Sequence, residues 1–189
     1  LGLDWILGVR SISVVVLTVS LVFVYKTTEE IAIRLKHAKL LNSIGQKIFP
    51  MLATTFVSLT GSHFFLSRFA TYDCIAVLAF SLGLWLVSKA GNLLIERSHI
   101  RHGLRSANTM LTFSGIAFFL SIMLRLGLIE NLPLIIAYAA FIIIVGGKDK
   151  VEMWQGIKRF FVPLCLSFLA YLAWNWDFVI WNISITHMT

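Results

Sequence analysis

Long runs of apolar residues alternate with short basic segments along the whole chain. Each run is long enough to cross the ~30 Å hydrocarbon layer of a bilayer as a helix, and none shows the alternation of barrel strands. The pattern therefore predicts six transmembrane helices. Their expected ranges are 3–25, 50–68, 72–90, 106–125, 131–147 and 160–181.

The composition excludes a water-soluble domain. The chain has 189 residues, of which 58% are hydrophobic and 13% charged, with a mean hydropathy of +0.86. A chain this small has too much surface for its volume to hide so many apolar side chains from water. In lipid, backbone hydrogen bonds must be made internally, which favours helices. We expect one all-α, polytopic membrane domain over residues 1–189.

The basic residues predict an orientation. The sixteen Lys and Arg residues give a net charge of +7, and most of them lie between spans in the segments 26–47, 89–105 and 148–159. Loops rich in Lys and Arg stay in the cytoplasm, so we expect both termini on the outer side. A positive charge at the ends of spans indicates contact with anionic lipid headgroups rather than with nucleic acid. The candidate contact residues for lipid or partner subunits are Arg34, Lys36, Lys39, Leu41, Lys47, Arg97, Arg101 and Arg105.

The segment 27–49 differs from the other loops. Thr27 and Glu30 have the spacing of a capping box, and apolar residues then recur every three or four positions. This pattern predicts a separate basic amphipathic helix. It either rests in the inner headgroup layer or docks a partner or a second copy of the chain.

Prolines and cysteines are few, and their positions constrain the spans. Pro50, Pro133 and Pro163 fall near the expected starts of spans, where the missing N–H costs little, so we predict no proline in the middle of a span. Cys74 and Cys165 are expected near opposite faces of the membrane. We therefore predict no disulfide between them.

A few polar residues inside the spans are candidates for function, because a charged group in hydrocarbon is costly unless it faces protein or water. His63, Asp177 and Arg10 are expected in the outer half of the membrane, where they could form a polar path for an ion or a proton. Alternatively, Arg10 pairs with Asp177 and both are structural.

Small residues also recur within the spans. Thr54, Ser58 and Ser62 lie on one face of the second span, and Ala79 and Gly83 have the same four-residue spacing in the third. Such spacing is typical of a close seam between membrane helices. The alternative for the second span is a polar lining that includes His63.

Glu29, Glu30 and Arg34 form an EExxxR sequence, and His63 follows in the next span. This resembles the glutamate element of the CAAX-processing type of intramembrane protease, which implies a catalytic role for the glutamates and His63. The chain departs from that family at Leu59, where a phenylalanine is expected, and in lacking the family's downstream histidine motif. The other interpretation is an ion pair between Glu30 and Arg34, one helical turn apart.

Glu96, His99 and His102 stand three residues apart, a spacing found in di-metal helical proteins. Those sites need several such copies, and the chain has one, so the residues are interpreted as a solvated loop. We expect no metal and no cofactor.

These observations favour a non-catalytic membrane subunit that assembles with itself or with partner chains and presents basic loops on the cytoplasmic side. The alternative is a small oligomeric ion channel or transporter. An intramembrane protease is a more remote alternative. No motif resembles a known family over most of the chain.

Overall fold

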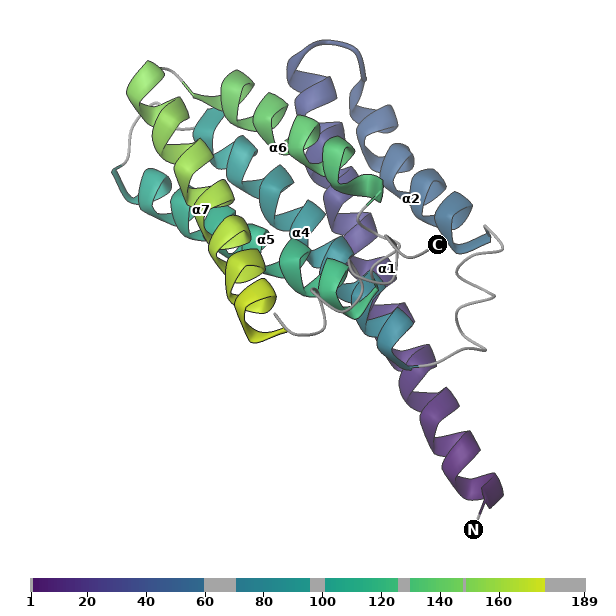
Figure 1. Ribbon diagram of the computed structural model, residues 1–189. Coiled ribbons are helices and arrows are strands. Elements are labelled where there is room, and N and C mark those ends of the chain that lie inside the picture. Colours follow the sequence, from purple (N-terminus) through teal and green to yellow (C-terminus); the bar gives the residue numbers. More distant parts are fainter. Residues whose placement is uncertain (1, 60–70, 96–100, 126–129, 148, 176–189) are drawn as a thin grey trace, which may run out of the picture.

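The computed structural model describes residues 2–59, 71–95, 101–125, 130–147 and 149–175. Almost all of these residues are helical (Figure 1). The helices are α1 (Gly2–His37), α2 (Ser43–Leu59), α4 (Thr71–Ile95), α5 (Arg101–Leu124), α6 (Leu132–Gly146) and α7 (Lys150–Trp174). Successive helices run in alternate directions, so the carboxyl ends of α1, α4 and α6 lie toward one end of the bundle.

Four of these helices are long and apolar enough to cross a membrane. They contain the stretches Arg10–His37, Asp73–Ile95, Arg105–Leu124 and Lys150–Ala173. The remaining two are shorter, with 17 residues in α2 and 15 in α6. The predicted all-helical fold with long apolar helices is thus confirmed. The number of helices differs, because the described residues hold six in total and not six spans plus one.

The missing element is the separate amphipathic helix at 27–49. Helix α1 continues without a break to His37, and the Thr27 hydroxyl donates to the Phe23 carbonyl of the same helix at 2.8 Å instead of capping a new one. The chain turns only afterwards, where Lys39 has a positive φ of 60°. The side chain of Asn42 then accepts from the Gly45 amide at 2.6 Å and begins α2. The capping-box spacing was misleading because nothing before Thr27 stops the first helix.

The proline prediction was partly wrong. Pro133 lies in the first turn of α6, as expected. Pro50 and Pro163 instead lie inside α2 and α7, because both helices begin several residues before the apolar runs do. Polar residues at Ser43–Lys47 and Lys150–Arg159 are helical as well, so the hydropathy pattern marks the apolar part of each helix but not its start.

Helix α4 is the centre of the bundle and packs against α1, α5 and α6. Its pairing with α1 is parallel, as contacts at three levels show: Ser13 with Cys74, Phe23 with Trp85 at a ring separation of 5.5 Å, and Arg34 with Asn92. Its pairing with α5 is antiparallel, since Gly83 meets Ser114 and Asp73 lies 3.8 Å from Arg125.

Small side chains recur every seven residues on the three central helices. All of them are at most 8% exposed: Ser13, Ser20 and Thr27 on α1, Cys74, Ser81 and Ser88 on α4, and Ala107, Ser114 and Ser121 on α5. A seven-residue period keeps one face of a helix turned toward its neighbour over several turns. The small side chains let the backbones approach, and the Ser114 hydroxyl donates across the seam to the Gly83 carbonyl at 2.9 Å.

Larger side chains fill the rest of the core. Phe118 packs edge-on against Phe80 and Phe160, with ring separations of 5.6 and 6.0 Å. Many other large apolar side chains point outward from the bundle, most of all on α1, α2 and α7. The bundle is thus apolar both inside and outside, and its buried polar groups are mainly small hydroxyls.

The close contact between α5 and α7 gives a test of the packing. A Cβ added at Gly115 would overlap the carbonyl oxygen of Phe160, which is backbone and cannot swing away, whereas one at Gly8 of α1 would meet nothing within 4 Å. Gly115→Ala should therefore destabilise the protein by about 1–3 kcal/mol. Gly8→Ala should be neutral or stabilising, because Ala favours helices by roughly 0.5–1 kcal/mol over Gly.

Thermal unfolding in mild detergent, followed by size-exclusion chromatography, would compare the two variants with the parent chain. Equal unfolding temperatures for both variants would contradict the α5–α7 packing.

Candidate functional site

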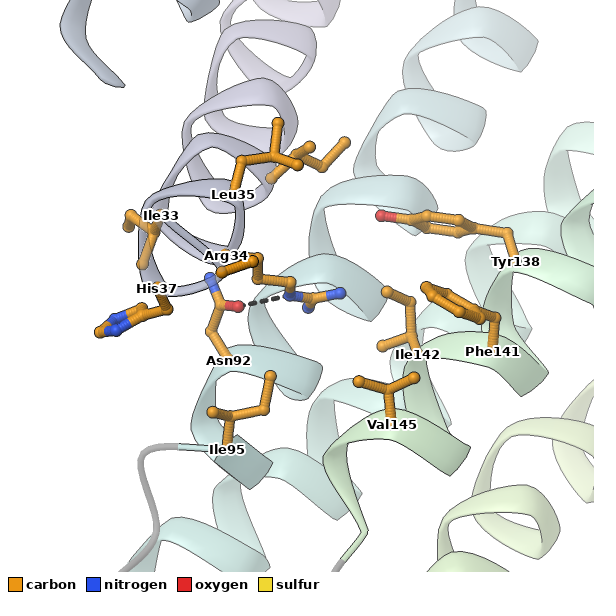
Figure 2. A pocket seen from close by; sticks show the side chains of 12 residues that line it. Ile33, Arg34, Leu35, His37, Asn92, Ile95, Tyr138, Phe141, Ile142 and Val145 are labelled. Carbon is orange, nitrogen blue, oxygen red and sulfur yellow. Dashed lines mark hydrogen bonds between the residues drawn. The ribbon is translucent and has the colours of Figure 1, made fainter. Parts of the chain in front are cut away.

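A polar cluster joins α1 to α4 near their carboxyl ends (Figure 2). The Arg34 side chain reaches from α1 to α4, where its Nε donates to Asn92 Oδ1 at 2.5 Å and its Nη2 donates to the Ser88 carbonyl. Asn92 Nδ2 donates back to α1, to the Glu30 carbonyl at 3.0 Å and to Glu30 Oε2 at 2.5 Å. These hydrogen bonds fix the two helices in one register.

Asn92 lies between two opposite charges. Glu30 and Arg34 are one turn apart on α1, yet the carboxylate and the guanidinium both bond to the amide of Asn92 and make no direct ion pair with each other. The amide oxygen faces the cation and the amide nitrogen faces the anion, so the dipole of the side chain is aligned with both. Hydrogen bonds to charged groups are the stronger kind, and this residue makes two of them.

Tyr138 connects α6 to the same cluster. Its hydroxyl lies 2.6 Å from the hydroxyl of Ser88, which is itself 2.8 Å from the Leu84 carbonyl. A serine hydroxyl has one hydrogen, and donation to Leu84 uses it. The phenol of Tyr138 therefore donates to Ser88. Three helices thus meet within one hydrogen-bonded network.

Two glycines make room for this arrangement. A Cβ at Gly91 would overlap both Nη2 of Arg34 and Cγ2 of Ile142, and one at Gly146 would lie 2.9 Å from the Cβ of Leu94. Without side chains at these positions, α4 and α6 can approach and the guanidinium can lie beside the α4 backbone. A side chain at Gly91 would therefore displace the guanidinium of Arg34 or the side chain of Ile142.

A groove of about 340 Å³ opens beside the cluster, between α1, α4 and α6. Its walls are mainly apolar and include Ile95, Phe141 and Val145, all of which are exposed toward the outside of the bundle. Arg34, His37, Asn92 and Tyr138 supply its polar atoms, and no acidic side chain in the described part of the chain lines it. The volume falls in the range of small-ligand pockets, ~300–1,000 Å³.

The other sequence-predicted residues lie away from this groove. Arg10, Lys36, Lys39, Lys47 and Arg105 are exposed, and Leu41 is half-buried. On α2, Ser58 donates to the Thr55 carbonyl of its own helix at 2.8 Å, and the buried hydroxyl of Thr54 has no hydrogen-bond partner among the described residues. On α4, Ala79 is half-buried, and Gly83 is buried against the ring of Phe118.

Several candidate residues lie outside the described ranges. They are Ser62, His63, Asp177, Glu96, Arg97 and His99, together with the side chains of Arg101 and His102. The polar path from His63 to Asp177 therefore stays a prediction, as does the loop interpretation of Glu96, His99 and His102.

The glutamates of the EExxxR sequence have other partners. Glu29 forms an ion pair with Lys26 at 2.7 Å, and Glu30 is bonded to Asn92. Cys74 and Cys165 are not joined by a disulfide. Across the residues that the structure places, no three His, Cys, Asp or Glu side chains gather in a way that could hold a metal ion.

Sequence reasoning missed Ser88, Gly91, Asn92 and Tyr138. The sequence does contain a signal for this cluster. Small residues recur every seven positions on α1 from Ser13 to Thr27, and the next position in this series is occupied by Arg34. A charged residue that continues a buried series must meet a polar partner on the facing helix. Ser88 continues the corresponding series on α4, and Asn92 follows one turn later.

No protein-family model, curated protein or solved structure matches this chain. The residues and contacts described above are therefore the basis for any functional conclusion.

A double-mutant cycle would measure the link between α1 and α4. Asn92→Leu removes one hydrogen-bond partner from both Glu30 and Arg34, and Arg34→Met leaves the Asn92 oxygen unpaired, so each should destabilise the protein by about 1–3 kcal/mol. The double variant removes the Arg34–Asn92 contact on both sides. It should cost less than the two single variants together, with a coupling of roughly 0.5–3 kcal/mol.

Unfolding free energies in mixed micelles would give the coupling. Pairing Asn92→Leu with Thr109→Ala is the additive control, because Thr109 is exposed and its hydroxyl donates to the Arg105 carbonyl of its own helix. Additivity in both cycles would contradict the network.

Proposed function

We propose that this protein is a non-catalytic, multi-pass membrane subunit that assembles with itself or with partner chains. The observation that carries the proposal is the contrast between its two kinds of surface. Large apolar side chains cover the outward faces of long helices, whereas the buried polar groups around Arg34 are bonded mostly to one another. A catalytic site needs reactive groups that point toward a substrate, whereas most polar groups of this cluster form hydrogen bonds that join its own helices.

The distribution of charge supports a fixed orientation in the membrane. Arg34, Lys36 and His37 occupy the last turn of α1, Lys89 lies near the end of α4, and Lys150 begins α7. These positions gather at the end of the bundle where α1, α4 and α6 finish. By the positive-inside rule, that end faces the cytoplasm.

Helix α2 is the strongest candidate for the assembly surface. It packs mainly against α1 and lies at the edge of the bundle (Figure 1). Exposed apolar side chains recur along it at three- and four-residue spacing and form a stripe. The stripe consists of Ile44, Ile48, Met51, Leu52, Phe56 and Leu59. A partner helix that packs here would cover this stripe.

The particle mass tests the proposal directly. The protein should stay with the membrane after carbonate washing and, when purified in mild detergent, form a particle that contains more than one 21.3 kDa chain. Light scattering corrected for bound detergent gives the protein mass. A uniform monomer without co-purifying chains would contradict the assembly proposal.

Enlarging one residue of the stripe separates a protein interface from a lipid-facing surface. Leu52 is 65% exposed on α2 and Leu169 is 59% exposed on α7. Lipid accepts a Trp in place of Leu at either position, whereas a packed interface does not. Leu52→Trp should therefore dissociate the assembly and Leu169→Trp should not, as measured by the same light scattering. Equal masses for the two variants would place the interface elsewhere.

A further inference from the structure

We propose that the groove between α1, α4 and α6 binds an anionic phospholipid, with its phosphate at Arg34 and part of an acyl chain along α6. The proposal rests on the membrane location assumed above but not on the oligomeric state. It assigns the groove a ligand that combines one negative charge with a long apolar tail.

The charge of the groove favours an anion. Arg34 lines it, no described acidic side chain does, and Nη1 of Arg34 donates no hydrogen bond within the described residues. Glu30 offsets part of the Arg34 charge from behind Asn92, and Glu29 is paired with Lys26. Lys36 and Lys39, which follow directly, have no acidic neighbour in α1 or the turn after it. Arg34 therefore gives the groove a positive wall, and Lys36 and Lys39 add positive charge at the adjoining turn.

The side chain of Arg34 suits a phosphate. A guanidinium binds phosphate oxygens through N–H groups held in a fixed plane. Arg34 is held rigidly by Asn92 and Ser88, so little side-chain entropy is lost when a ligand binds. Lys36, Lys39 and Asn42 line a second hollow at the adjoining turn, where a polar headgroup could extend.

The apolar walls favour a lipid over free phosphate. Figure 2 shows Phe141, Ile142 and Val145 along α6 on one side of the guanidinium and Ile95 on α4 below it. Phe141 and Val145 are also exposed to the outside of the bundle. An acyl chain from the surrounding bilayer can therefore enter sideways and cover these walls, whereas inorganic phosphate would leave them bare.

Two neighbouring residues of α6 provide a matched pair of variants. Val145 is 55% exposed and lines the groove, and Ile144 is 50% exposed and does not. Val145→Trp should fill the chain-binding part of the groove without touching the Arg34 cluster. Ile144→Trp adds a similar bulk to a face that has no part in binding.

The test uses the full chain, purified in detergent, and native mass spectrometry with phosphatidylglycerol, phosphatidylcholine or inorganic phosphate added. Phosphatidylglycerol should bind more tightly than phosphatidylcholine by about tenfold, because both lipids carry the phosphate but the positive side chains at the end of α1 repel the choline cation of phosphatidylcholine. Arg34→Gln should abolish that preference. Val145→Trp should weaken the binding of phosphatidylglycerol by roughly tenfold, whereas the affinity of Ile144→Trp should stay within about twofold of that of the parent chain.

Three results would overturn the proposal: equal binding of the two lipids, equal effects of the two Trp variants, or displacement of the lipid by inorganic phosphate alone. If Arg34→Gln does not fold, the Val145 and Ile144 pair still decides, because neither touches the cluster. A monomeric particle that binds phosphatidylglycerol selectively would reject the assembly proposal and leave the lipid site standing.

Discussion

The backbone of α4 lies close to three other helices, and that approach depends on small side chains at regular positions. Ser81 and Ser88 on α4 face neighbours whose own buried residues are small, and Gly83, Gly91 and Gly146 remove even the Cβ where the contacts are tightest. Lipid is as apolar as the helix surfaces, so two helices in a membrane gain nothing by burying apolar surface against each other. Close packing and hydrogen bonds between helices must therefore stabilise their association. The spacing of small residues therefore decides which faces meet.

The polar cluster is a consequence of that spacing. Once α1 and α4 lie parallel and close, Arg34 reaches the end of the seam, where an unpaired cation would be very unfavourable. The side chain of Asn92 stabilises this cation, because it forms hydrogen bonds with both the guanidinium of Arg34 and the carboxylate of Glu30. The groove lies beside this contact, and its walls combine Arg34 and Asn92 of the cluster with apolar side chains of α4 and α6.

The sequence predicted the helical fold and the apolar part of each helix, because both follow from hydropathy over a long window. It failed at the helix ends. Thr27 and Glu30 resembled a start signal although the true boundary lies at Lys39 and Asn42, where a left-handed residue and an N-cap occur together. Pro50 and Pro163 were misplaced for the same reason.

The candidate site was harder to predict than the fold. Arg34 was recognised as a contact residue, but it was assigned to the surface because it lies in a basic segment. Its partner Asn92 is distant in the sequence and is not part of any motif, so only the relative register of α1 and α4 reveals it. Register depends on packing between helices and cannot be read from the pattern of either helix alone.

Cross-linking within the chain tests the parallel register of α1 and α4 most directly, because both the cluster and the groove depend on it. With Cys165 replaced by Ser, a Ser13→Cys variant should form a disulfide with the native Cys74 under mild oxidation in membranes, since their side chains are in contact. Val14, the next residue, is exposed on another face of the helix, so Val14→Cys should not form a disulfide with Cys74. A faster-migrating single chain for Ser13→Cys alone is the predicted result. Cross-linking of Val14→Cys but not of Ser13→Cys would contradict the arrangement of the whole bundle.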